Sequence, residues 1–277
     1  DRLSQPADAT NTAYTAMAAQ NKFKLALSSP SGPPLTICWL SLACDTAAEL
    51  LAQAGFAACL VDAEHAPNDL DLIRRQIMAI ELSGQSSVIA RTPINEPWVI
   101  KRLMDAGAQT ILVPMVDTAE QAAAAAAALR FPPEGTRGVA GASRAAGFGG
   151  YRKGYLTTAN AEACCIVQIE STTGVANIEA IAAVPGVDAL FIGPSDLAAS
   201  LGHLGNPNAP EVLEVLESAV QRIVAAGKPC GIFAFEPERA RRFIELGARF
   251  VAVGSDVSLL VAGAKALVAE FAPKPPT

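Results

Sequence analysis

Eight short runs of apolar, often β-branched residues recur along the chain of 277 residues, and longer stretches rich in helix formers separate them. Each run is hydrophobic almost without a break, as strands require when both faces of a parallel sheet are covered. No Gly-rich dinucleotide turn follows the first run, which disfavours a doubly wound sheet. We therefore predict an α/β protein with the (β/α)8 TIM barrel fold. The runs span residues 35–40, 57–62, 87–91, 109–115, 164–169, 188–193, 229–234 and 249–254.

The stretches between the runs carry the signals of helices that end just before a strand. Three of them reach a glycine directly ahead of a run, in "QAGFAACLVD", "DAGAQTILVP" and "ELGARFVAVG", which is typical of a helix C-terminus. Because no linker interrupts the repeat, we predict an N-terminal arm over residues 1–22 and a single barrel domain over residues 23–277. One long irregular stretch, residues 131–159, predicts a lid over the barrel mouth.

Charge, hydropathy and cysteine usage exclude several classes of protein. The net charge is −6 and no cluster of basic residues with interleaved aromatics occurs, so we expect no nucleic-acid partner. No run approaches about 18 uninterrupted apolar residues, so we expect no membrane span. The six cysteines are scattered, without CxxC spacing. We interpret them as reduced core residues and predict a cytoplasmic protein.

Polar residues gather at the C-terminal ends of the predicted strands, where the active sites of such barrels lie. The strand ends concerned read "VDAEHAPN", "IAR", "VQIE" and "FIGPSDL". We expect their polar side chains to converge on one barrel mouth. These are Asp62, Glu64, His65, Arg91, Gln168, Glu170 and Asp196.

Glu170 and Asp196 are candidate metal ligands because they follow consecutive strands. Their carboxylates can approach a common point about one strand spacing apart, which leaves open positions for water and a substrate. Two hard oxygen ligands suggest Mg²⁺ or Mn²⁺, with Co²⁺ as a further candidate. Alternatively, the two acids cap helices or pair with arginine at the rim.

His65, Asp62 and Arg91 are candidates for acid–base and electrostatic roles. A histidine beside a carboxylate suits a general base, although His65 can equally cap the following helix. Arg91 is either a structural counter-ion or a group that stabilises a developing negative charge. The main-chain N–H groups at Ser195, where "GPSD" opens a helix, can bind a carboxylate. His203 lies in a polar turn, and we interpret it as peripheral.

Several motifs taken together resemble the HpcH/HpaI family of class II pyruvate aldolases. They are "VDAEHAPND", "IARTPIN", "QTILVPMV", "FPPEGTRGV", "VQIE", "FIGPSDLAASLG" and "FVAVGSD", in this order from about residue 23 to residue 271. The resemblance implies a barrel of the phosphoenolpyruvate/pyruvate-binding type that cleaves 4-hydroxy-2-oxo acids to pyruvate and an aldehyde. It also implies a divalent metal, a metal-bound pyruvate enolate, and a homo-oligomer, commonly a hexamer built from dimers that exchange a C-terminal helix.

The resemblance also assigns roles to individual residues. His65 is similar to the family's base, and Arg91 to its transition-state arginine. Asp105 lies ahead of a strand, so a neighbouring subunit or an indirect effect has to explain its role. Phe233 departs from the aliphatic residue that is frequent at its position, and we expect it to face the second substrate. The implied groups are the metal ligands Glu170 and Asp196; the substrate contacts Gln168, Ser195, Asp196 and Phe233; and Asp62 and Asp105 as acids that orient the histidine.

Two alternatives remain at this point. A macrophomate synthase-like sub-branch uses a similar half-site to decarboxylate oxaloacetate and couple the product to a 2-pyrone. That sub-branch resembles this chain less near the end of the fourth strand, where a histidine is replaced by Met115. The other alternative is a non-catalytic barrel that serves as a binding protein, which the set of His65, Arg91, Glu170 and Asp196 disfavours.

Overall fold

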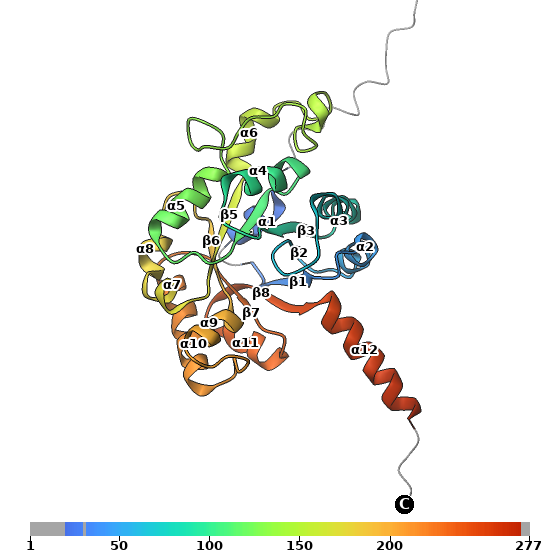
Figure 1. Cartoon of the computed structure of the whole chain (residues 1–277), viewed down its shortest axis with the longest axis vertical. Helices are drawn as coiled ribbons and strands as arrows, with labels where there is room; N and C mark the ends of the chain where they lie inside the picture. Colours follow the sequence, from blue (N-terminus) through green and yellow to red (C-terminus); the bar gives the residue numbers. More distant parts are fainter. Residues whose placement is uncertain (1–19, 30–31, 273–277) are drawn as a thin grey trace, which may run out of the picture.

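The eight predicted runs form the eight strands of a closed, parallel barrel in which β8 pairs with β1. The computed structural model describes residues 20–29 and 32–272. Figure 1 shows the strands at the centre and the helices around them. The strands are β1 (Leu35–Leu40), β2 (Ala58–Asp62), β3 (Ser87–Arg91), β4 (Thr110–Val113), β5 (Cys164–Ile169), β6 (Ala189–Ile192), β7 (Cys230–Phe233) and β8 (Ala248–Ser255). The prediction of a (β/α)8 TIM barrel is confirmed.

Helices connect each strand to the next. Asp69 caps one of them by accepting the Leu72 N–H, and Gly84 ends the same helix in the left-handed conformation, with φ of 68°, as the turn chemistry requires. The three glycines of the quoted motifs also have positive φ. The helices are α1 (Lys22–Leu27), α2 (Asp45–Gln53), α3 (Leu70–Ser83), α4 (Pro97–Ala106), α5 (Ala119–Ala128), η1 (Gly147–Gly149), α6 (Tyr155–Glu162), α7 (Thr172–Ala176), α8 (Ile178–Ala182), α9 (Pro194–Ser200), α10 (Pro210–Ala225), α11 (Pro237–Glu245) and α12 (Asp256–Phe271).

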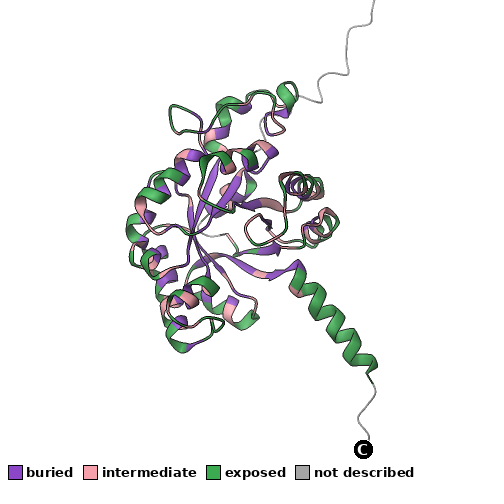
Figure 2. Ribbon diagram, viewed as in Figure 1, coloured by how far each residue is buried: buried purple, intermediate pink, exposed green. Residues whose placement is uncertain are grey.

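Alternate residues of each strand face the inside of the barrel, and the others face the helices. Figure 2 shows the strands buried and the outer helix faces exposed. The inner positions form one apolar cluster, which includes Ile37, Trp39, Leu60 and Ile89. Helix α1 closes the N-terminal end of the barrel, where its Phe23 packs edge-to-face on Phe250 at 5.7 Å. Most of the predicted arm, residues 1–19, lies outside the described residues.

The long stretch 131–159 does not form a lid over its own barrel mouth. It leads from a helix, α5, into the fifth strand, so it returns to the N-terminal ends of the strands. There it packs outside α3 and α4. Arg144 pairs with Glu81 at 2.5 Å and donates to Ala106 O at 2.9 Å. None of its residues lines the cavity at the mouth. The lid prediction is therefore wrong for this chain taken alone.

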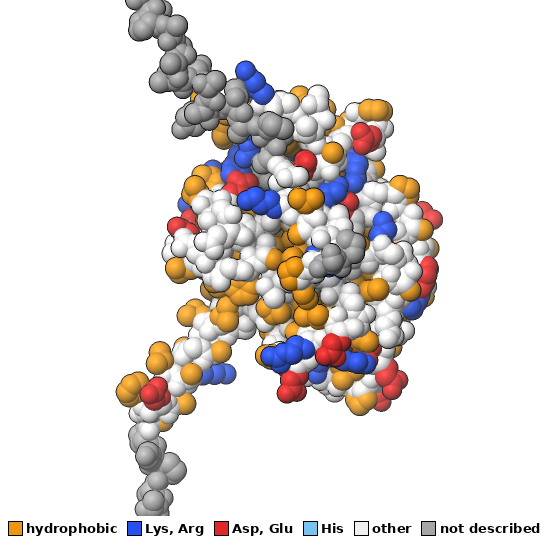
Figure 3. All heavy atoms as spheres, turned by 180° about the vertical axis from the view of Figure 1, so that it is seen from behind, with side chains coloured by type: hydrophobic (Ala, Val, Ile, Leu, Met, Phe, Trp, Pro, Cys, Tyr) orange, Lys and Arg blue, Asp and Glu red, His pale blue; other side chains and the backbone are white. Residues whose placement is uncertain are grey.

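Helix α12 projects away from the barrel instead of packing on it (Figure 1). After its buried first residue, Asp256, the helix is exposed along its length. The apolar side chains that it presents to solvent are Val257, Leu259, Leu260, Val261, Leu267, Val268 and Phe271. Hydrophobic side chains also lie exposed on the body next to the base of the helix (Figure 3). An amphipathic helix normally buries such side chains, so α12 has no apolar partner surface within the described chain.

The six cysteines are free thiols, and five of them are buried. Burial raises the pKa of Cys59 to about 11, which leaves its thiol unreactive. This agrees with our interpretation of the cysteines as core residues, whereas the cytoplasmic location stays a prediction. Among the described helices, none combines the length and the apolar character needed to cross a membrane.

Candidate active site

The C-terminal ends of the strands enclose a cavity of about 420 Å³, here called the mouth cavity. A further predicted residue, Glu170, lies directly beside this cavity, because its Oε2 accepts a hydrogen bond from Gln168 Nε2 at 2.5 Å. The structure thus brings together every predicted site residue except Asp105. The predicted residues that line the mouth cavity are Asp62, His65, Arg91, Gln168, Ser195, Asp196 and Phe233.

Asp62 and Arg91 stand opposite each other on β2 and β3 and form a buried, two-pronged ion pair. Arg91 Nε and Nη2 donate to Asp62 Oδ1 and Oδ2 at 2.9 and 2.7 Å. Burial alone raises the pKa of Asp62, but the hydrogen bonds and the charge of Arg91 outweigh it and hold that pKa below its usual value. Asp62 is therefore ionised, and it fixes the plane of the guanidinium.

Trp39, at the end of β1, belongs to the same cluster and was not predicted from the sequence. Its indole Nε1 donates to Asp62 Oδ2 at 3.2 Å, and the Arg91 guanidinium lies 4.7 Å from the centre of its ring. The indole thus contacts both members of the ion pair, through a hydrogen bond and a cation–π contact. The alternation of β1, which points position 39 into the barrel, is the signal that could have identified it.

Glu64 places a second carboxylate on Arg91, with its Oε2 2.8 Å from Nη1. Burial raises the pKa of Glu64, and the charge of Arg91 opposes this rise. The guanidinium is therefore held between two acids, and its orientation is set before any substrate arrives.

Glu170 follows β5 and is only 3% exposed. Its Oε1 accepts a hydrogen bond from the main-chain N–H of Met115 at 2.7 Å. Burial raises the pKa of Glu170 to about 7; the charges of Asp196 and Glu64 add to the rise, and the Met115 N–H opposes it. A positive charge placed nearby would stabilise the ionised form of this carboxyl group and lower its pKa.

The turn between β6 and α9 approaches Glu170 closely because it begins with a glycine. A Cβ on Gly193 would lie 2.6 Å from Glu170 Oε2 and 2.7 Å from Gln168 Nε2, so any other residue would displace these side chains. Ser195 and Asp196 follow in the first turn of α9 and are exposed to the mouth cavity. The absence of a side chain at position 193 thus brings the turn that carries Asp196 against Glu170.

The oxygen atoms at this place suit a hard divalent ion. Glu170 and Asp196 offer carboxylates, and the buried Oε1 of Gln168 has no hydrogen-bond partner among the described residues. Within the described ranges, no group of three or more His, Cys, Asp or Glu side chains forms a complete cage. Two carboxylates with open positions match the way Mg²⁺ is bound, because this ion keeps several water molecules.

His65 lies exposed at the rim of the mouth cavity. Asp62 Oδ1 accepts the main-chain N–H of His65 at 3.3 Å and that of Glu64 at 2.9 Å. We predicted that a carboxylate orients the imidazole. In the structure, Asp62 binds the main chain of His65 and the side chain of Arg91, so it fixes the turn that carries the histidine.

Aromatic side chains form one wall of the mouth cavity. Phe233 and Phe235 stack with their ring centres 4.1 Å apart, and Trp39 meets Phe233 edge-to-face at 5.4 Å. Phe191 completes this aromatic wall. The mouth cavity therefore has charged groups around Arg91 and Glu170 and an apolar wall formed by the aromatic rings.

Asp105 lies away from the mouth. It is near the C-terminal end of α4, which leads toward the start of β4 and therefore toward the opposite end of the barrel. Its Oδ1 accepts a hydrogen bond from Arg137 Nη2 at 2.6 Å, and it lines a different surface cavity with Arg74 and Arg102. Within one chain, Asp105 cannot touch His65 or the substrate.

Comparison with known proteins identifies the family. The sequence model of the HpcH/HpaI aldolase/citrate lyase family matches residues 35–262. The chain is 46% identical over 252 residues to the hydroxypyruvate/pyruvate aldolase of Roseobacter denitrificans, covering 91% of this chain and 97% of that protein. It is 47% identical over 252 residues to the 5-keto-4-deoxy-D-glucarate aldolase of Salmonella arizonae, covering 91% and 96%.

Solved structures agree with these relatives. A HpcH/HpaI aldolase/citrate lyase family protein from Burkholderia cenocepacia superposes with a TM-score of 0.87 at 45% identity, covering 91% of this chain and 99% of that one. A macrophomate synthase superposes with a TM-score of 0.73 at 28% identity, covering 90% of each chain. The chain therefore belongs to the HpcH/HpaI aldolase/citrate lyase family, and it is an aldolase.

Proposed function

We propose that this aldolase carries out the divalent-metal-dependent, reversible cleavage of a 4-hydroxy-2-oxo acid to pyruvate and an aldehyde. One observation carries the proposal: a rigidly held guanidinium, Arg91, lines the mouth cavity with Asp196, and the buried Glu170 lies directly beside it. The setting of Glu170 favours a nearby cation. The relatives named above, both aldolases, support it.

Glu170 and Asp196 would hold the ion, with Mg²⁺ as the first candidate and Mn²⁺ or Co²⁺ as alternatives. When bound, the ion supplies positive charge that acidifies the methyl protons of pyruvate. Gln168 and the main chain of Ser195, which both line the cavity, contact the carboxylate end of the substrate.

Arg91 stabilises the negative charge that develops on the 2-oxo oxygen as the C3–C4 bond breaks. Because Asp62 and Glu64 already orient it, little reorganisation is needed during the reaction, which is how preorganised charge accelerates a step. His65 accepts the proton of the 4-hydroxyl group, the electron pair of the C3–C4 bond passes to the 2-oxo acid as an enolate, and the aldehyde leaves. A proton from solvent then adds to C3 and gives pyruvate. In the direction of synthesis, the same imidazole returns the hydroxyl proton. The aldehyde contacts the aromatic wall at Phe233.

Exchange of the pyruvate methyl protons with deuterium oxide, followed by proton NMR, tests the pyruvate half of the proposal. We expect exchange only with a divalent ion present. Glu170→Gln and Asp196→Asn should abolish it, whereas Glu214→Gln, a matched change on the exposed face of α10, should not. Absence of exchange with Mg²⁺, Mn²⁺ and Co²⁺ alike would refute the proposal.

A macrophomate synthase-like reaction on oxaloacetate and a 2-pyrone is the second candidate, and the structural similarity to such an enzyme supports it. Met115 lies exposed just after β4, and its main-chain N–H donates a hydrogen bond to Glu170. A methionine at this position cannot supply the imidazole that the macrophomate synthase-like sub-branch has there. Incubation with oxaloacetate plus a pyrone, and separately with pyruvate plus aldehydes, distinguishes the two candidates by product mass. Because the chain is an aldolase, we set the non-catalytic alternative aside.

We also propose that the active form is a homo-oligomer, a hexamer or a set of dimers that exchange α12. The exposed apolar side chains of α12 support this, since a second copy of the chain offers them the same kind of surface on which a (β/α)8 barrel normally packs its last helix. In such an assembly, Asp105 of one subunit can approach the mouth of another.

A further inference from the structure

The region between α5 and β5 contains a buried arginine that the proposed reaction does not use. The side chain of Arg137 is 0% exposed. Its Nη2 donates to Asp105 Oδ1 at 2.6 Å and to the Tyr155 hydroxyl at 3.1 Å, and its guanidinium lies 4.5 Å from the centre of the Phe131 ring. Its Nε and Nη1 have no hydrogen-bond partner among the described residues. Buried polar groups, and charged ones above all, are nearly always satisfied.

Arg137 lines a small cavity, here called the inner cavity, together with Arg152 and Tyr155. Its volume of about 10 Å³ leaves room for the centre of one water-sized particle. The remaining lining residues are apolar or glycine, apart from Gln109. Any occupant is therefore a single small species beside the side chains of two arginines.

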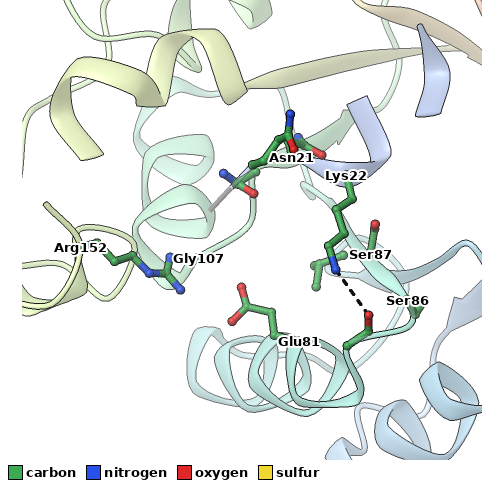
Figure 4. A pocket seen from close by; sticks show the side chains of 11 residues that line it. Asn21, Lys22, Glu81, Ser86, Ser87, Gly107 and Arg152 are labelled. Atoms are coloured by element: carbon green, nitrogen blue, oxygen red, sulfur yellow. Dashed lines mark hydrogen bonds between the residues drawn. The ribbon is translucent and has the colours of Figure 1, made fainter. Parts of the chain in front are cut away.

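The inner cavity adjoins a larger pocket of about 270 Å³ at the N-terminal ends of the strands, here called the outer pocket. The two share Gly107, Gln109 and Arg152 in their walls. Figure 4 shows the Arg152 side chain directed into the outer pocket, with Lys22 and Glu81 on other sides of it. The outer pocket therefore brings solvent up to the wall of the inner cavity.

The charge around the inner cavity favours an anion over water. Asp105 compensates Arg137 through Nη2, which shares one edge of the guanidinium with Nε, whereas the free Nη1 lies on the other side. In the described part of the chain, no ion pair joins Arg152 to a carboxylate, and its Nη1 donates to Ala145 O at 3.3 Å. No Asp or Glu lines the inner cavity. The Tyr155 oxygen accepts from Arg137, so its own O–H can donate. A site with one uncompensated positive charge and several donors selects an anion.

We propose that the inner cavity binds one monovalent, halide-sized anion, chloride under ordinary conditions, between Arg137 and Arg152. Such an ion accepts an N–H bond that Arg137 leaves unpaired at Nη1 and balances the charge of Arg152. Phosphate and carboxylates are too large for the inner cavity. Since both arginines and Tyr155 belong to the connection between α5 and β5, the ion stabilises this connection against α4. The proposal is independent of the proposed function at the mouth.

Bromide, which replaces chloride and scatters anomalously, tests the site directly. Crystals of the full chain grown with sodium bromide should show an anomalous peak within hydrogen-bond reach of Arg137 Nη1. The peak should be absent from Arg152→Gln crystals and present in crystals of the matched control Lys153→Gln, whose side chain is exposed. A wild-type map without an anomalous peak there, including one with a water molecule instead, would overturn the proposal.

Thermal unfolding of the same proteins supplies a measurement that needs no crystal. At equal ionic strength, chloride should stabilise the wild-type protein relative to gluconate, which is too large to enter. At a chloride concentration ten times the dissociation constant, the ratio of folded to unfolded protein should rise about elevenfold. Arg152→Gln should lose this dependence and Lys153→Gln should keep it. Equal midpoints for wild-type protein in the two salts would contradict chloride binding.

Discussion

Acidification should weaken divalent-ion binding through protonation of Glu170. Burial raises the pKa of this carboxyl group from 4.5 to about 7, and a carboxylic acid must lose its proton before it can act as a ligand. At pH 5.5 the protonated form outnumbers the ionised form by about thirty to one. The apparent dissociation constant of the ion should therefore be about 30-fold higher at pH 5.5 than at pH 8.

Isothermal titration with Mn²⁺ in paired buffers of different ionisation enthalpy measures both the affinity and the number of protons released. We expect release of about one proton per ion at pH 6 and almost none at pH 8. Glu170→Gln should bind weakly and lose this proton release, whereas His65→Asn should retain it, which separates the two titrating groups. A dissociation constant that stays within twofold between pH 5.5 and pH 8 would refute the reasoning.

The same raised pKa determines how the stability of the metal-free protein depends on pH. The folded state binds the Glu170 proton more tightly than the unfolded state, so the free energy of unfolding should fall as the pH rises from 4.5 to 7. A shift of this size corresponds to about 3 kcal/mol from this one group. Urea denaturation at pH 5 and pH 8 should reveal the loss in the wild-type protein, and its absence in Glu170→Gln.

Three further substitutions test the mouth cavity and the assembly. Arg91→Lys should lower kcat/KM about 100-fold or more, because an ammonium group cannot reproduce the two-pronged contact with Asp62; a loss below tenfold would contradict its role. Trp39→Phe keeps the ring beside Arg91 but removes the hydrogen bond to Asp62, so kcat should fall about fivefold with little change in the KM for pyruvate. Leu260→Glu on α12 should dissociate the oligomer in light scattering after gel filtration, while the Lys265→Glu control should not; an unchanged mass would contradict helix exchange.

Most of the barrel could be predicted from the sequence because each strand is buried on both faces and therefore apolar throughout. The ends of these apolar runs also located the strand ends, and with them Asp62, Arg91 and Gln168. The register of β2 and β3, which sets Asp62 opposite Arg91, depends on hydrogen bonding between strands that no local pattern encodes. Trp39 was not predicted for a related reason. A tryptophan within an apolar run is interpreted as a core residue until its neighbours on the adjacent strands are known.

The errors lie where packing beyond the strand pattern decides. The stretch 131–159 was predicted as a lid from its length alone, although its place after a helix and before a strand already assigned it to the opposite end of the barrel. The sequence of α12 shows helix formers and apolar residues, but no local signal tells whether such a helix packs on its own barrel or on a second one. The role of Asp105 depends on the same packing between chains, because within one chain this residue lies away from the mouth.

The charges at the mouth set an order on ligand binding. Asp62, Glu64, Glu170 and Asp196 surround a single guanidinium, Arg91, and two of these acids are already engaged with it. An anionic 2-oxo acid that approaches this cavity therefore meets net negative charge, and the attraction of Arg91 alone does not compensate for it. Uptake of a divalent cation removes most of this repulsion and also favours the ionised form of Glu170. The raised pKa of Glu170 and the weak affinity for substrate that we expect before a cation is bound are thus two consequences of the same arrangement of carboxylates.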